Sequence, residues 1–161
     1  MNYWLMKSEP DVFGINDLYN KPNRTEHWDG VRNYQARNMM RDAMKLGDHV
    51  FFYHSNCDQP GIVGIMEVAK EGYPDFTAFD PDDSHFDPKS DPTQPRWIMV
   101  DVKYVRTLSR TITLKELKSR PELTGMVLLR RGNRLSIIPV SEEEWRYIIS
   151  LETTQPIMEV S

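Results

Sequence analysis

The sequence has a single cysteine, Cys57, among 161 residues, so an intrachain disulfide cannot form. This fits a reducing compartment, and we expect a cytoplasmic protein, or a nuclear one if the source is eukaryotic. Nowhere does an apolar run approach the roughly 18 residues that a membrane helix needs. The N-terminus also lacks the basic and apolar regions of a secretion signal. The composition therefore predicts an intracellular chain without a membrane partner.

Motifs for cofactor and metal chemistry are lacking as well. Neither a P-loop nor a dinucleotide-binding glycine fingerprint occurs. His54 and Cys57 have a ligand-pair spacing but no second pair, and Asp80, Asp82 and Asp83 lack the glycine of a calcium loop. A nucleophilic Cys57 with His54 as its base is an alternative that no further residue supports. We expect neither a metal nor a cofactor.

The excess of negative charge is small and lies in one segment. The whole chain has a formal charge of −4, whereas residues 74–95 contain six aspartates and one lysine. Five prolines in the same segment forbid regular helix or central strand, so it is predicted to be a loop, packed onto the body by Phe76, Phe79 and Phe86. The rest of the chain is close to neutral, which argues against sequence-blind coating of nucleic acid.

Hydrophobic periodicity predicts strands and helices that do not alternate regularly as βαβ units. Strands are expected at residues 3–7, 49–55, 61–69, 97–108 and 135–140, with a bulge at Tyr104–Val105. Helices are expected at residues 15–18, 33–46, 113–120 and 141–151, the second capped by Asn33 and the last opened by a capping box at Ser141. This pattern favours an α+β fold on a curved sheet or small barrel, with one domain over residues 1–152 and a tail over 153–161.

Polar and aromatic residues gather where these elements end, which is where sites are commonly built. The segments are Lys7–Pro10, Trp28–Gln35, Tyr53–Asn56 and Arg130–Arg134. Arginines beside them could form a basic rim for phosphates. The plainer alternative is that Trp28 and Tyr34 are core aromatics and the arginines an ordinary surface, and composition alone favours it.

The same segments resemble the motif blocks of EVE domains. The blocks are NYWLMKSEPDVF, WDGVRNYQARN, VFFYHSN, GIVGIMEV, YPD, RWIMVDVKYV and LLRRGNRLSIIPV, in order from about Asn2 to Leu151. No block departs from the family pattern. The resemblance implies a PUA-like fold, a curved β-barrel of about five to six strands with flanking helices, related to the YTH domains that read methylated adenine in RNA.

The resemblance also implies a function, the binding of a modified base in DNA or RNA without turnover. By the same resemblance, the base pocket is expected to comprise Lys7, Ser8, Glu9, Trp28, Asn33, Tyr34, His54, Ser55, Asn56, Tyr73 and Pro74. Phosphates are expected to contact Arg32, Arg37, Arg131 and Arg134.

Our hypothesis is that a base is flipped out, stacks on Trp28, and has its edge read by Ser8, Glu9, Asn33 and Ser55. One domain with a single-base pocket needs no partner subunit, so we expect a monomer. Two alternatives stay open. The first is a PUA-like hydrolase that acts on a modified nucleoside or RNA through Lys7, Glu9 and His54. The second is a protein-interaction module that uses the acidic loop.

Overall fold

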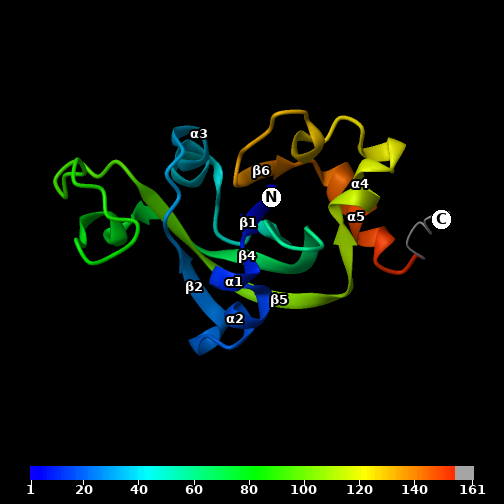
Figure 1. Cartoon of the computed structure of the whole chain (residues 1–161), viewed down its shortest axis with the longest axis horizontal. Coiled ribbons are helices and arrows are strands. Elements are labelled where there is room, and N and C mark those ends of the chain that lie inside the picture. Colours follow the sequence, from blue (N-terminus) through cyan, green and yellow to red (C-terminus); the bar gives the residue numbers. More distant parts are fainter. Residues whose placement is uncertain (155–161) are drawn as a thin grey trace.

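A six-stranded mixed sheet with flanking helices forms the body of the protein (Figure 1). The computed structural model describes residues 1–154. The strand order is β2-β5-β4-β3-β1-β6, in which β1 and β3 pair in parallel and all other neighbours are antiparallel. The strands are β1 Tyr3–Ser8, β2 Thr25–Trp28, β3 His49–His54, β4 Gly61–Pro74, β5 Ile98–Thr113 and β6 Ile137–Val140. The predicted α+β class and strand number are confirmed.

The helices are short and lie around the sheet. The α-helices are α1 Pro10–Phe13, α2 Ile15–Tyr19, α3 Tyr34–Asn38, α4 Leu114–Lys118 and α5 Glu142–Leu151. One π-helical turn, η2 Met39–Ala43, follows α3, and 3-10 turns lie at η1 Pro22–Arg24, η3 Phe76–Phe79, η4 Pro121–Leu123 and η5 Val127–Leu129. Within residues 1–154, no helix has the length and apolar character that crossing a membrane requires.

Alternation along the strands produces two hydrophobic cores, one on each face of the sheet. On β1, Trp4 and Met6 join one core and Leu5 joins the other; on β3, Phe52 and Phe51 divide in the same way. The first core packs against α2 and α3, and the second packs against α4 and α5. Both faces are therefore covered, and the ends of the strands remain for a binding site.

One strand and one helix differ clearly from the sequence-based prediction. Strand β2 was not predicted, because four residues that lead into a loop give too short a pattern. The predicted helix over 33–46 is the short α3 followed by the π turn, and it ends at Ala43. Strand β4 passes directly against this π turn at Gly72. A Cβ on Gly72 would lie only 2.7 Å from the Met40 carbonyl oxygen, so the close approach requires glycine.

Other local predictions are confirmed. Asn33 caps α3 by accepting from the Ala36 amide, and Ser141 and Glu144 form the capping box of α5. The β4–β5 ladder slips between Arg106 and Tyr104, which places a bulge at Val105. The predicted loop over 74–95 is largely irregular beyond η3. From residue 155 on, the predicted tail lies outside the described residues.

Candidate functional site

A cavity of about 570 Å³ opens where β1 and β2 end, beside α1 and the loop over residues 80–97. This volume falls within the roughly 300–1,000 Å³ typical of small-ligand sites. Five residues that the sequence analysis singled out line it: Lys7, Ser8, Glu9, Trp28 and Arg32. Nine others line it as well: Val12, Phe13, Glu26, His27, Asp29, Gly30, Val31, His85 and Ser136.

Aromatic and aliphatic side chains form one wall of this cavity. Trp28 is only 8% exposed, so most of its ring packs in the core and a small part reaches the cavity. Phe13 and Phe52 meet it edge-on, with ring centroids 6.2 Å and 5.5 Å away. These contacts fix the orientation of the indole. Val12 and Val31 add apolar surface beside it.

The end of β1 supplies polar groups whose positions are fixed by neighbouring chain segments. The Ser8 hydroxyl donates to the Phe13 carbonyl oxygen at 2.6 Å, and the Glu9 carboxylate accepts from the side-chain Nδ2 of Asn56 at 3.1 Å. Burial lowers the pKa of Lys7 below its ordinary value. The Lys7 amide donates to the Ser136 carbonyl oxygen at 2.9 Å, which ties β1 to the segment before β6.

Several residues expected in the pocket lie outside it. Asn33 uses its side-chain oxygen to cap α3, and Tyr34 is exposed and stacks on Trp97 with ring centroids 5.0 Å apart. Ser55 donates its amide to the Ser8 carbonyl oxygen at 3.0 Å. Like Asn56, it sits beside the end of β1 without lining the cavity.

His54 has a structural role at the start of α2. Its Nε2 accepts a hydrogen bond from the Ile15 amide at 3.1 Å, which fixes the neutral tautomer that carries its proton on Nδ1. Burial lowers its pKa, and the charge of Asp17 opposes this only in part. His54 does not line the cavity.

Tyr73 and Pro74 were expected to form the opposite wall, but the structure places them elsewhere. The Tyr73 hydroxyl donates to Asp101 at 2.5 Å, and burial together with this carboxylate raises the pKa of Tyr73. Neither residue lines the cavity. The contribution of the loop comes instead from His85, which packs over Gly30 so closely that a Cβ on Gly30 would lie 2.5 Å from the imidazole.

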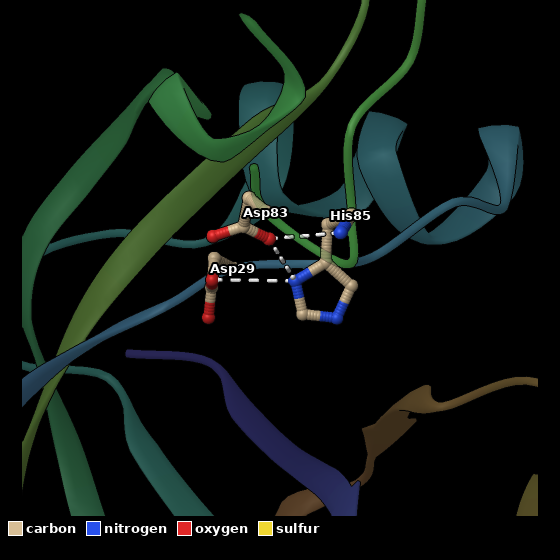
Figure 2. Close-up of side chains that lie close together, drawn as sticks. All are labelled: Asp29, Asp83 and His85. Atoms are coloured by element: carbon tan, nitrogen blue, oxygen red, sulfur yellow. Dashed lines mark hydrogen bonds and ion pairs between the residues drawn. The ribbon is translucent and has the colours of Figure 1, made fainter. Parts of the chain in front are cut away.

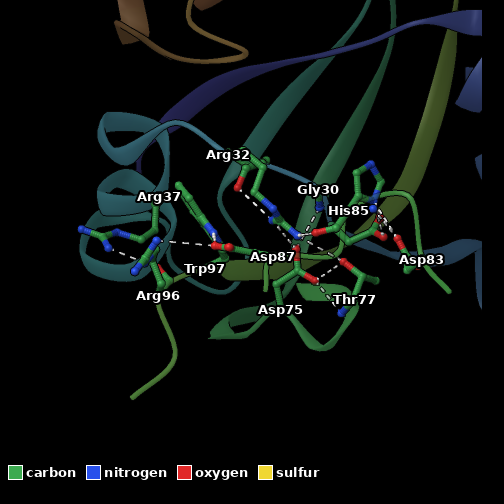
Figure 3. A network of polar contacts seen from close by, with 12 residues as sticks. Gly30, Arg32, Arg37, Asp75, Thr77, Asp83, His85, Asp87, Arg96 and Trp97 are labelled. Atoms are coloured by element: carbon green, nitrogen blue, oxygen red, sulfur yellow. Dashed lines mark hydrogen bonds and ion pairs between the residues drawn. The ribbon is translucent and has the colours of Figure 1, made fainter. Parts of the chain in front are cut away.

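Arg32 connects the cavity to the loop through a buried carboxylate (Figure 3). Its guanidinium donates to Asp75 at 3.0 Å and to the His85 carbonyl oxygen at 2.7 Å. Asp75 is fully buried and also accepts from the Gly30 amide at 2.9 Å and the Thr77 hydroxyl at 2.5 Å. Burial raises the pKa of Asp75, but these hydrogen bonds and the Arg32 charge outweigh it and leave the pKa below its ordinary value.

The other arginines that were expected to contact phosphates differ in their exposure and in the hydrogen bonds that they make within the protein. Arg37 donates to the Arg96 carbonyl oxygen at 3.1 Å and to Asn38. Arg131 and Arg134 are exposed, in the segment that continues to the cavity-lining Ser136. Arg32 lines the cavity, but its guanidinium is already paired.

His85 directs its Nδ1 toward two carboxylates that lie on the same side of its ring, at the cavity rim (Figure 2). Its Nδ1 lies 3.3 Å from Asp83 and 3.5 Å from Asp29. Within residues 1–154, these three side chains are the only group of acidic, histidine or cysteine ligands close enough to share a metal ion. Neither separation has the geometry of a hydrogen bond, and Nδ1 has no hydrogen-bond partner among the described residues. His54 and Cys57 do not join any such group.

A larger hollow of about 860 Å³ lies at the other end of the molecule, between the start of β4 and α4. No aromatic side chain lines it, and its central carboxylate, Glu116, is paired with Arg110 and Arg120. Its walls therefore offer little that could recognise a ring. The smaller cavity has both aromatic and polar groups and is the stronger candidate for a site.

Sequence reasoning missed the loop and β2 contributions to the cavity. His27 and Asp29 flank the predicted Trp28, so proximity in the chain could have indicated them. His85 lies in a loop whose packing the sequence did not predict, and Ser136 reaches the cavity only through the sheet order. Neither residue carries a local signal.

Comparison with known proteins gives a consistent result. The family model described as EVE domain matches residues 2–151. Mouse thymocyte nuclear protein 1 is 51% identical, covering 96% of this chain and 75% of that protein. The crystal structure of the human THYN1 protein in complex with DNA that contains 5-methylcytosine superposes with a TM-score of 0.92 at 49% identity, covering 97% of this chain and all of that one. A Pseudomonas putida protein superposes with a TM-score of 0.87 at 47% identity, covering 93% of this chain and 99% of that one.

Proposed function

Because the chain belongs to the EVE domain family, we propose that it binds DNA through a modified base held in the cavity between β1 and β2. One observation carries this proposal. The cavity occurs in a chain 49% identical, and closely similar in structure, to a protein crystallised with DNA that contains 5-methylcytosine.

The cavity has the chemistry that a flipped pyrimidine needs. Trp28 and Phe13 offer ring contacts to the base, and Val12 and Val31 offer apolar surface to a methyl group. Glu9, which is exposed, and Ser136, which is half-buried, present polar atoms for the base edge, so a base with a different edge forgoes these hydrogen bonds. Arg131 and Arg134 are exposed cations in the segment that continues to the cavity-lining Ser136, and we assign them to contacts with flanking phosphates.

We favour binding over hydrolysis because the acid-base group that hydrolysis would use is engaged elsewhere. His54 accepts from the Ile15 amide and lies outside the cavity, so Lys7, Glu9 and His54 do not converge on one point. We further propose that one copy of the chain suffices, since a pocket for a single base within one domain does not require a partner subunit.

A matched pair of tryptophan substitutions tests the proposed function. Trp28 and Trp145 are both 8% exposed, but only Trp28 lines the cavity, while Trp145 stacks on Phe51 in the other core. We expect Trp28→Ala to weaken binding of a 5-methylcytosine duplex by about 10-fold, because stacking on one ring contributes about 1–3 kcal/mol. Trp145→Ala is expected to change affinity less than about 2-fold.

Binding is measured by fluorescence anisotropy on methylated and unmethylated duplexes of one sequence, at a temperature where circular dichroism shows both variants folded. The wild type is expected to prefer the methylated duplex. Equal affinity for the two duplexes, or equal losses in the two variants, would refute the cavity as the base-binding site.

A further inference from the structure

Phe76 is an exposed aromatic residue at the rim of the cavity. Its side chain is 53% exposed, and its ring lies 5.0 Å from that of His27, which lines the cavity. Two other exposed aromatics contact rings elsewhere, Tyr19 on Tyr104 and Tyr34 on Trp97. Among the exposed aromatic residues of the described chain, Phe76 alone contacts a ring of the cavity wall.

The backbone that carries Phe76 is held in place on both sides. Its neighbours Asp75 and Thr77 are 0% and 3% exposed. Asp75 accepts from the Thr77 amide at 2.9 Å, and also from the Gly30 amide and the Arg32 guanidinium (Figure 3). The exposed ring therefore stands on a network that is anchored in the cavity wall, and little conformational freedom would be lost when it binds a planar partner.

The charge of this rim disfavours a phosphate contact. The segment over residues 74–95 has six aspartates and one lysine, so a phosphate placed against it would be repelled. A neutral π-face tolerates this field, because base stacking does not require a positive charge. What the rim can offer to nucleic acid is therefore a surface for a base.

We propose that Phe76, supported by His27, is a stacking platform for the base next to the one held in the cavity. This rests on the proposed function. When a nucleotide is turned out of its strand, its neighbour loses a stacking partner and exposes one face of its ring. Phe76 replaces that partner at the rim and holds the distorted strand open.

The stacking platform is tested by combining substitutions of Phe76 with removal of a flanking base in the DNA, singly and together. The probes are duplexes with one 5-methylcytosine opposite an abasic site, so that no base pair has to be broken, and with either an intact base or a second abasic site at one flanking position. For the wild type, we expect an abasic flank on one side to weaken binding by about 5-fold or more. Phe76→Ala is expected to weaken binding of the intact probe by a similar factor and to show no further loss with the abasic flank.

Three variants complete the test. Phe76→Trp is expected to restore the affinity and the sensitivity to the abasic flank, whereas Phe76→Leu, which has no π-face, is not. Tyr19→Ala removes another exposed aromatic, 44% exposed, and is expected to leave affinity within about 2-fold.

The outcomes separate the two proposals. If Trp28→Ala abolishes binding while Phe76→Ala leaves it unchanged, the platform is overturned and the cavity stands. If Phe76→Ala and the abasic flank weaken binding additively, Phe76 acts elsewhere and the platform is also overturned. If Trp28→Ala has no effect and methylation makes no difference, the proposed function fails, and the platform fails with it.

Discussion

Asp75 shows how a single residue can organise a binding site without lining it. Its two carboxylate oxygens are shared among Gly30, Arg32 and Thr77, and none of its surface is exposed. In the sequence it is one of six aspartates in the segment over residues 74–95 that was predicted to be a loop. Nothing in its immediate sequence distinguishes it from the other aspartates of the loop, because the partners that set it apart, Gly30 and Arg32, lie more than forty residues away.

At this scale we predict that Asp75→Asn lowers the free energy of unfolding by about 3 kcal/mol. This value is the lower end of the range for breaking a buried ion pair, and we choose it because the partner, Arg32, is partly exposed. The folded-state pKa of Asp75 lies below the ordinary value of 3.8. Its contribution is therefore complete above pH 3.8 and is lost as the pH falls through the folded-state pKa.

Urea unfolding of wild type and Asp75→Asn at a series of pH values measures this. The stability difference should shrink as the pH falls below 3.8. Asp82→Asn, in the same loop but exposed, provides the control and is expected to change stability by less than about 0.5 kcal/mol. A difference between wild type and Asp75→Asn that stays constant with pH would contradict the assigned role.

At the scale of elements, the acidic loop is ordered by a repeated local device. Five of its aspartates each accept from the amide two residues further on, at Thr77, Asp82, His85, Lys89 and Thr93. These are Asx-turns, which fold a chain locally without helix or strand. The charge of the loop is thus a by-product of its fold, and the spacing of aspartates was a signal that a sequence reading could have used.

His54 supports another element, the start of α2, and its effect depends on pH. Its folded-state pKa is lowered from 6.5 by burial, so the native state binds the proton less readily than the unfolded chain. The contribution of neutral His54 to the free energy of unfolding is complete above pH 6.5 and is lost as the pH falls from 6.5 through the folded-state pKa. His54→Gln keeps an acceptor for the Ile15 amide but cannot be protonated.

We therefore predict that wild type loses stability as the pH is lowered from 7 toward 5, and that His54→Gln loses distinctly less. Thermal unfolding followed by circular dichroism across this range gives the comparison. Parallel curves for the two proteins would show that His54 does not contribute to the pH dependence. DNA affinity at pH 7.5 should be unaffected by the substitution, because His54 lies outside the cavity.

For the whole molecule, five of the six strands and four of the eleven residues expected in the base pocket followed from the sequence. Strong apolar runs gave β1, β3, β4 and β5, and the polar residues after β1 line the cavity as expected. The errors share one cause. Whether Tyr73 or His85 reaches the cavity depends on how β4 and the loop pass over the sheet, which is decided by contacts between distant segments.

The distribution of charge over the whole molecule predicts weak dependence on salt. With a net charge of −4 and an acidic loop beside the cavity, few phosphates can be neutralised. We expect the logarithm of the association constant to fall with the logarithm of salt concentration with a slope of about −2 to −3, which corresponds to two or three phosphate contacts. Arg131→Ala and Arg134→Ala should each reduce the slope by about one.

Anisotropy titrations between 50 and 300 mM salt, as a rough working range for such slopes, provide the measurement. A slope steeper than about −6 would mean that the backbone, and not the base, dominates binding. A slope unchanged in both arginine variants would place the phosphate contacts elsewhere on the surface.

The hydrogen bond between Lys7 and Ser136 has a consequence for how the protein is made. It joins the first strand to a segment more than 120 residues later in the sequence, just before β6, and both residues line the same cavity. A ribosome must therefore release the chain through residue 136 before the cavity can close around a ligand. Nascent chains that stall before β6 would expose β1 along one edge and would be unable to bind, so activity would appear only after Ser136 has emerged.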